Sequence, residues 1–419
     1  MEKLLIKGGN TLSGVIDCSG AKNAALPVIA ASILSSDDII LKNLPYLQDI
    51  TTMFELIGSM GAEISLDESM NFKLNTSNLS NLEARYELVK TMRASILVLG
   101  SMVAKYGYAK IALPGGCAIG SRPVNYHLKA LEKLGVEISL NNGYIEAKAK
   151  KLIGAEIEFE GITVTGTENL MMAASLAEGV SILTNVAKEP EISDLADFLN
   201  SMGAKISGAG TDKIRIEGVE CLNGTSFQIP ADRIEAGTYL VAAALTNGKI
   251  TINKIDSSRM GAVIENLEKA GAEVNSNDHS ITLDMTNHII KPVNIITAPF
   301  PGFPTDMQAQ FTVLNCMGKG KSHVKETIFE NRFMHVQELN RMGTDISING
   351  TTASINGVES ISGAQVMATD LRASASLILA GLVAKGETIV DRIYHIDRGY
   401  ERIEEKLSNL GAEIMRLPN

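Results

Sequence analysis

The sequence predicts an α/β protein of two domains, each built from three copies of one repeated unit. Three observations predict this fold class. The chain of 419 residues is too long for one ordinary hydrophobic core. A short phrase recurs six times along it, and amphipathic helices alternate with strands around each copy. Solenoid repeats usually run about 20 to 50 residues, so these longer units favour closed domains.

The recurring phrase places a glycine between the end of a helix and the start of a strand. It reads SMGAEI at 59–64 and returns as KLGVEI, SMGAKI, KAGAEV, RMGTDI and NLGAEI. Its glycines are spaced by 74, 68, 68, 72 and 68 residues and are Gly61, Gly135, Gly203, Gly271, Gly343 and Gly411. In AVIENLEKAGAEV, the residues Val263, Leu267 and Ala270 recur at helical spacing. Glycine after such a helix can adopt the left-handed conformation that ends it.

A second type of helix, rich in small residues, precedes a turn and a strand in these units. TYLVAAALTNGKITIN, NLMMAASLAEGVSILTN and SASLILAGLVAKGETIV are examples. These helices are apolar nearly all round, which predicts that they are buried, with the sheets packed around them.

Six units suggest three per domain, with the chain crossing between domains near FQIPADRIEAG, at 227–237. The strand expected near residues 3 to 17 has no earlier unit to join and could pair with either domain. We therefore expect the chain to cross between the domains a second time, near residue 20. The predicted domains are residues 20–229 and residues 1–19 with 230–419.

Composition excludes several classes of protein. The formal net charge of −10 argues against a nucleic-acid partner. MEKLLIKGGNTLSG lacks the pattern of a signal peptide, and no apolar run is long enough for a membrane span. The four cysteines are scattered, and neither they nor the six histidines show metal-ligand spacing. We therefore expect reduced thiols, no metal site and a cytoplasmic location.

DCSGAKNAALP, at 17–27, places Lys22 and Asn23 just before the first buried helix. A lysine beside free backbone N–H groups at a helix N-terminus suits a phosphate or carboxylate ligand. The alternative is an Asn23 that caps the helix beside a solvated Lys22.

Arginines start two further apolar helices. KTMRASILVLGSM and ATDLRASASLILAG set Arg93 and Arg372 at equivalent places in their units, each followed by Ala-Ser. Positive charge at the positive end of a helix dipole is unfavourable unless an anion lies nearby, so the repetition favours an anion site over two surface ion pairs. Arg398, in IYHIDRGYERIEEKL, is a third candidate, or else a link in the charge series from Asp397 to Arg402.

FPGFPTDMQAQ, at 300–310, is stiffened by Pro301 and Pro304, and its helix is expected to begin near Met307. Thr305 or Asp306 could simply cap that helix. Held by stiff backbone, the Asp306 carboxylate is also well placed to accept a proton from a hydroxyl.

ALPGGCAIGSR, at 112–122, sets Cys117 in a glycine-rich turn before a helix expected to begin near Pro123. The helix N-terminus and Arg122 would both favour the thiolate, and such a thiol can act as nucleophile, proton donor or both. His127 lies inside the predicted helix, so no cysteine–histidine pair is indicated. The alternatives are a stray cysteine in a mobile loop and a lid that closes over substrate.

Together, SGAKNAALP, LPGGCAIGSRPV, GFPTDMQAQ, ENRFMH, ATDLRASASL and YHIDRGYERIE resemble the UDP-N-acetylglucosamine enolpyruvyl transferase family over essentially the whole chain. The related enolpyruvylshikimate phosphate synthases share the fold but lack the GGC loop. The resemblance implies a two-domain inside-out α/β barrel that closes over a cleft. It also implies transfer of the enolpyruvyl group of phosphoenolpyruvate to the 3′-hydroxyl of UDP-N-acetylglucosamine, with release of phosphate. This reaction is the committed step of peptidoglycan synthesis and requires no cofactor.

The resemblance also implies roles for individual residues. Cys117 would be the lid thiol that protonates phosphoenolpyruvate, forms a covalent adduct with it and reacts with fosfomycin. Asp306 would accept the proton of the sugar hydroxyl. Residues implied to hold phosphoenolpyruvate are Lys22, Asn23, Arg122 and Arg398. Residues implied to contact the sugar nucleotide are Arg93, Arg122, Pro123, Val124, Asn125, Tyr126, Thr163, Val164, Asp306 and Ile328. Residues implied to support the cleft are Asp370, Arg372 and Arg332.

Two positions depart from the family pattern. Asn125 replaces the usual aspartate after Arg-Pro-Val, and Ser101 stands where a proline is expected. Asn125 could change a uracil or ribose contact, but it leaves the expected acid, base and cationic cluster intact. The competing hypotheses are an enolpyruvylshikimate phosphate synthase and a silent paralogue that binds the sugar nucleotide as a regulatory module.

Overall fold

The structure, a computed structural model, describes residues 2–114 and 124–418. It contains two compact units. The unit that we call terminal comprises residues 2–19 and 231–418, and the unit that we call central comprises residues 20–114 and 124–230. Each unit has a hydrophobic core of its own.

The described residues form six four-stranded sheets, three in each unit, which confirms the predicted α/β class and its six repeats. The sheets of the central unit are β14(Thr225–Gln228)-β3(Ile39–Lys42)-β5(Phe72–Asn75)-β4(Glu63–Leu66), β6(Glu83–Ala84)-β7(Tyr108–Ala112)-β9(Tyr144–Lys148)-β8(Glu137–Asn141) and β10(Glu156–Glu158)-β11(Val180–Thr184)-β13(Lys213–Glu217)-β12(Lys205–Ser207). Those of the terminal unit are β16(Glu273–Ser276)-β17(Ser280–Asp284)-β15(Lys249–Asn253)-β2(Ser13–Asp17), β18(Ile295–Ile296)-β19(Lys321–Lys325)-β21(Thr352–Asn356)-β20(Asp345–Asn349) and β22(Gln365–Met367)-β23(Glu387–Asp391)-β1(Lys3–Lys7)-β24(Glu413–Leu417).

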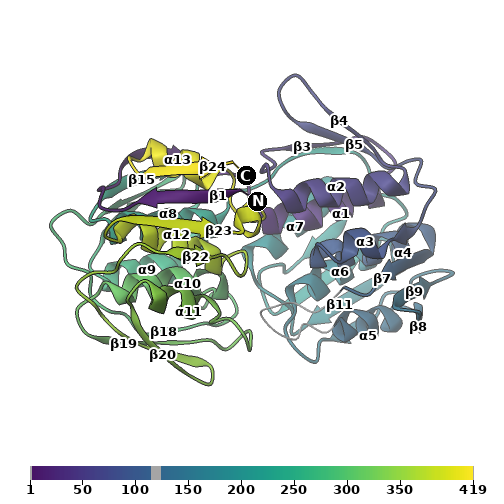
Figure 1. Cartoon of the computed structure of the whole chain (residues 1–419). Helices are drawn as coiled ribbons and strands as arrows, with labels where there is room; N and C mark the ends of the chain where they lie inside the picture. The colour runs from purple at the N-terminus through teal and green to yellow at the C-terminus, as the bar shows by residue number, and fades with distance from the viewer. Residues whose placement is uncertain (1, 115–123, 419) are drawn as a thin grey trace. The chain divides into compact units, whose positions relative to one another are not determined.

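All six sheets share one pairing pattern. An edge strand runs parallel to its neighbour, as β10 does to β11, and the other two pairings are antiparallel. In the last sheet the third strand is β1, drawn in purple between the yellow strands β23 and β24 (Figure 1). The N-terminal segment thus completes the final repeat of the terminal unit.

The segment expected as one strand near residues 3 to 17 forms two strands, β1 and β2, in two different sheets of the terminal unit. A tight passage at Gly8 and Gly9 separates them. A Cβ on Gly8 would lie 2.3 Å from the carbonyl oxygen of Ala384, and Gly9 has a φ of +108°. The change of sheet therefore needs two residues without side chains.

The small-residue helices are buried, as predicted. They are α1 (Lys22–Ala31), α4 (Val98–Tyr106), α6 (Val164–Ala174), α8 (Arg233–Leu245), α10 (Gln308–Cys316) and α12 (Ala373–Val383). All residues of α10, and all of α8 after Arg233, are buried. In the terminal unit α8, α10 and α12 contact one another, and in the central unit α4 contacts both α1 and α6. Several of the predicted site residues lie at or just before the start of these buried helices, as Lys22, Val164 and Arg372 do.

Six amphipathic helices end at the recurring glycine, also as predicted. They are α2 (Gln48–Met60), α5 (Asn125–Lys133), α7 (Pro190–Ser201), α9 (Gly261–Lys269), α11 (His335–Arg341) and α13 (Ile403–Asn409). The six glycines have φ values between +93° and +113°. Residues with a side chain rarely adopt this left-handed backbone conformation, which explains why glycine recurs at this position of the phrase. The short elements are α3 (Tyr86–Val89) and the 3₁₀ turns η1 (Ser32–Leu34), η2 (Arg93–Leu97), η3 (Ser257–Met260), η4 (Thr305–Met307) and η5 (Ile393–His395).

The role of these glycines can be tested at Gly343, which has a φ of +96° and no neighbouring atom within 4 Å of the point where a Cβ would stand. Gly343→Ala should lower the free energy of unfolding by about 1–2 kcal/mol, since only the backbone conformation is penalised. Gly261→Ala is the matched control, because its φ is −46° and its surroundings are equally open. That change should be neutral or stabilise by about 0.4–1 kcal/mol. Urea unfolding of both variants measures the difference, and shifts of equal sign and size would contradict the argument.

Candidate active site

Asp306 lies in the 3₁₀ turn η4, at the entrance to the buried helix α10. Arg332 Nη2 donates a hydrogen bond to its Oδ1 at 2.6 Å, and Arg372 Nε lies 3.6 Å from its Oδ2. Neither η4 nor α10 has a side-chain cap, so the capping role considered for Thr305 and Asp306 is wrong. The carboxylate is instead one member of an ion cluster, and its side chain remains 26% exposed.

The charge state of Asp306 follows from this cluster. Burial by itself would raise the pKa of Asp306, but the positive charges of Arg332 and Arg372 outweigh it. The pKa of Asp306 is therefore held well below its usual value. The group is a carboxylate throughout the physiological pH range, able to accept a hydrogen bond or a proton.

Arg332 is also connected, through the hydroxyl of Thr305, to a buried carboxylate that the sequence did not indicate. Arg332 Nη1 donates to Thr305 Oγ1 at 2.6 Å, and that hydroxyl donates to Glu326 Oε2 at 2.8 Å. Glu326 is 1% exposed, and its Oε1 accepts the backbone N–H of Ile328 at 2.8 Å. Glu326 therefore fixes both the arginine and the segment that carries Ile328. The sequence feature that could have indicated Glu326 is its position directly after the strand β19.

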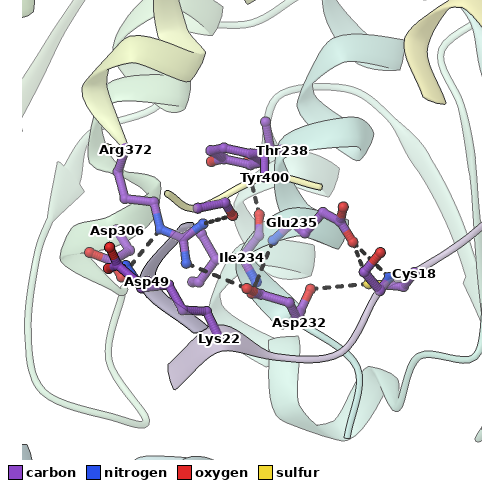
Figure 2. Close-up of polar contacts among 12 residues, drawn as sticks. Cys18, Lys22, Asp49, Asp232, Ile234, Glu235, Thr238, Asp306, Arg372 and Tyr400 are labelled. Atoms are coloured by element: carbon purple, nitrogen blue, oxygen red, sulfur yellow. Dashed lines mark hydrogen bonds and ion pairs between the residues drawn. The ribbon is translucent and has the colours of Figure 1, made fainter. Parts of the chain in front are cut away.

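Arg372, the residue before α12, is almost fully buried. Its Nη1 donates to the Gly399 carbonyl at 3.2 Å, and its Nη2 lies 3.5 Å from Asp232 Oδ2 (Figure 2). Asp370 Oδ1 accepts the backbone N–H groups of Arg372 and Ala373 at 2.9 and 2.8 Å, so Asp370 fixes the start of the helix. The structure thus brings Asp306, Arg332 and Arg372 together, with Asp370 acting on the backbone.

In the central unit, Lys22 is the first residue of α1 and is only 8% exposed. Its Nζ lies 2.7 Å from Asp49 Oδ2. The residue at the N-cap is Ala21, and no side chain caps the helix. The alternative of a capping Asn23 beside a solvated Lys22 is therefore wrong. Asp49 is a partner that the sequence analysis did not anticipate.

Two further candidates of the central unit also start helical segments. Arg93 is the first residue of η2, which leads into α4. Thr163 caps α6, its Oγ1 accepting the Gly166 N–H at 3.2 Å, and Val164 is the first residue of that helix. Ser101, at the position where a proline was expected, is buried in α4 and its Oγ lies 3.1 Å from Met172 Sδ.

Asn125 is the first residue of α5, and the ring of Tyr126 lies against Gly161, within 3.1 Å of where a Cβ would stand. The segment before Thr163 and the start of α5 are therefore neighbours. A hollow of about 380 Å³ adjoins Tyr126, between α5 and β10, with Phe159 in its wall. These observations place Asn125, Tyr126 and Thr163 in one region of the central unit.

Arg398 lies in the turn after η5. Its charged neighbours have other partners: Asp397 pairs with Arg416 at 2.7 Å, and Arg402 pairs with Glu405 at 3.2 Å. These pairings do not involve Arg398, whose role stays a prediction. Cys117, Arg122 and Pro123 lie outside the described residues, while Val124 is the residue before α5.

Among the residues that the structure describes, no group of three or more histidine, cysteine, aspartate or glutamate side chains could hold a metal ion. None of the described helices combines the length and apolarity needed to cross a membrane.

Comparison with known proteins identifies the class to which this fold and site belong. The sequence model of the EPSP synthase (3-phosphoshikimate 1-carboxyvinyltransferase) family matches residues 6–407, and the chain belongs to this family. The chain is also 58% identical over 416 residues to the UDP-N-acetylglucosamine 1-carboxyvinyltransferase of Hydrogenovibrio crunogenus, covering 99% of this chain and all of that protein. It is 58% identical over its full length to the protein of the same name from Coxiella burnetii, strain Dugway 5J108-111, of which 96% is covered. The crystal structure of the enolpyruvyl transferase NikO from Streptomyces tendae has the same fold, with a TM-score of 0.89 over 99% of both chains at 24% identity.

Proposed function

We propose that this protein transfers the enolpyruvyl group of phosphoenolpyruvate to the 3′-hydroxyl of UDP-N-acetylglucosamine and releases phosphate. The observation that carries the proposal is the 58% identity, over essentially the whole chain, to enzymes named UDP-N-acetylglucosamine 1-carboxyvinyltransferase. Within the chain, Asp306 is an ionised carboxylate at the N-terminal end of a buried helix, which supports a proton-accepting role for this residue. The reaction would serve peptidoglycan synthesis in the cytoplasm.

The chemistry proceeds by addition and elimination. The sugar oxygen forms a bond to C2 of phosphoenolpyruvate while C3 gains a proton and the hydroxyl loses one. The C2–O bond to phosphate then breaks and C3 gives up a proton, which restores the vinyl group. One acid and one base suffice, and each proton transfer is typically worth about 10²–10⁴-fold in rate.

We assign the base to Asp306 and the acid to Cys117. A carboxylate with a lowered pKa is a weak base, but it need not be strong here. As C2 gains oxocarbenium character and the sugar oxygen bonds to it, that oxygen becomes positively charged and its proton becomes very acidic. The two arginines keep Asp306 ionised and oriented until that moment.

The remaining residues would bind the two anionic substrates. Lys22, Asn23, Arg122 and Arg398 are proposed to hold phosphoenolpyruvate, since cations stabilise both its carboxylate and the departing phosphate. The burial of Lys22 beside Asp49 supports a fixed rather than a solvated ammonium group. We propose that the sugar nucleotide contacts Arg93, the run from Arg122 to Tyr126, Thr163, Val164 and Ile328.

A phosphate-release assay tests the proposed function. The enzyme should release inorganic phosphate from phosphoenolpyruvate only when UDP-N-acetylglucosamine is also present. If shikimate 3-phosphate proved the better acceptor, the chain would be an enolpyruvylshikimate phosphate synthase. Binding of UDP-N-acetylglucosamine without any phosphate release would instead support the regulatory module.

A further inference from the structure

Tyr400, which no role above uses, lies against the guanidinium group of Arg372. It is 1% exposed, and the centroid of its ring lies 5.2 Å from Arg372 Cζ, within the range of a cation–π interaction. The preceding residue, Gly399, accepts a hydrogen bond from Arg372 Nη1. A Cβ on Gly399 would lie 2.4 Å from Cδ2 of Leu371, so this turn packs closely against the segment that precedes α12. Arg372 is thus held by two consecutive residues of one turn.

The hydroxyl of Tyr400 is fixed by a partner of known hydrogen-bond direction. Thr238, on the buried helix α8, donates its single hydroxyl proton to the Ile234 carbonyl at 2.8 Å. The Tyr400 hydroxyl, 2.9 Å from Thr238 Oγ1, must therefore be the donor of that contact (Figure 2). The buried side chain of Thr238 on α8 therefore fixes the orientation of the Tyr400 ring.

The same hydroxyl is connected to the proposed base. Gln310 Nε2 lies 3.2 Å from the Tyr400 oxygen, 3.1 Å from Thr238 Oγ1 and 3.0 Å from the backbone carbonyl of Asp306. The amide has two hydrogens for these three acceptors, so one of the bonds is shared. Gln310 thereby links the backbone of Asp306 to the tyrosine that lies under Arg372.

We propose that Tyr400 is a positioning residue, which sets the Arg372 guanidinium against the Asp306 carboxylate through its ring and its hydroxyl. This inference rests on the proposed function, in which Asp306 accepts the substrate proton. Tyr400 does not touch the reacting atoms in this role. It acts on the transition state through Arg372, because small displacements of a charged partner reduce rate more than they reduce substrate binding.

The chain offers a matched control for removing a buried tyrosine hydroxyl. Tyr239, next to Thr238 on α8, is also 1% exposed, but its hydroxyl has no hydrogen-bond partner among the described residues. Tyr400→Phe should lower kcat for phosphate release about 3- to 10-fold with both KM values within about twofold, the loss expected for one net hydrogen bond. Tyr239→Phe should leave kcat unchanged.

A double-mutant cycle separates positioning from general structural support. In an Arg372→Lys background, which cannot keep the same geometry on the ring, Tyr400→Phe should change kcat less than twofold. If the effects of the two substitutions on kcat were independent and simply multiplied, the inference would be overturned. A Tyr400→Phe variant with the kcat of the wild type would overturn it as well. If Tyr400→Phe does not fold, Thr238→Val removes the acceptor instead and should lower kcat similarly, while Thr238→Ser should restore it. A wild-type enzyme that releases no phosphate contradicts the proposed function, whereas an active wild type with an unaffected Tyr400→Phe contradicts only this inference.

Discussion

Replacing Asp306 by asparagine should reduce kcat for phosphate release roughly 10²–10⁴-fold. Asparagine has nearly the same shape but cannot accept a proton, and its amide faces Arg332 Nη2 where a carboxylate oxygen stood at 2.6 Å. The variant also leaves Arg332 and Arg372 without the anion that lies between them, so some loss of thermal stability should accompany the loss of rate. UDP-N-acetylglucosamine should still bind, because the other residues proposed to contact the nucleotide are unchanged.

Asp278→Asn is the matched control, since Asp278 is an exposed aspartate of the same unit. It should retain wild-type kcat and stability. Steady-state kinetics, with circular dichroism to confirm folding, compares the two variants. A folded Asp306→Asn enzyme with near wild-type kcat would remove Asp306 from the role of base.

Replacing Cys117 by serine should also reduce kcat about 10²–10⁴-fold. A serine hydroxyl is a far weaker acid than a thiol, so it cannot protonate C3 of phosphoenolpyruvate at a useful rate. The same variant should resist fosfomycin, because only the thiolate can open the epoxide, forming a carbon–sulfur bond and leaving the oxygen as a hydroxyl. Wild-type enzyme should gain the mass of one fosfomycin molecule.

Cys221→Ser provides the control, because Cys221 is an exposed free cysteine elsewhere in the chain. It should keep full activity and still react once with fosfomycin. Intact-protein mass spectrometry and phosphate release measure both effects. Undiminished turnover by Cys117→Ser would end the proton-donor role, and labelling that persists in that variant would move the reactive thiol elsewhere.

Local patterns were sufficient to predict the repeated architecture and the position of many candidate residues. The glycine after each amphipathic helix needs a positive φ, which is a property of one residue and its neighbours. Apolar helices such as α8 indicated their burial by composition alone. Arg93, Asp306 and Arg372 were recognisable because each stands at the start of such a helix.

The partners of those residues could not be predicted from local sequence patterns. Nothing near Asp306 in the chain predicts Arg332 at 2.6 Å, and nothing near Lys22 indicates which carboxylate lies beside it. Tyr400 stood within a recognised motif, yet its contacts with Thr238 and Arg372 join segments separated by 162 residues in one case. Such contacts depend on how three buried helices pack together.

The sequence by itself determined the six repeated units, the class of fold and the residue types available for acid–base chemistry. Helix ends and buried helix faces can be predicted in this way because they depend on local residue patterns. Only the tertiary structure decided that β1 completes the last sheet of the terminal unit, that Glu326 and Asp370 support the arginines, and that Arg372 lies between Asp232, Asp306 and Tyr400. These arrangements join residues far apart in the chain. Their energies come from pairing and burial that exist only once the helices and sheets have packed.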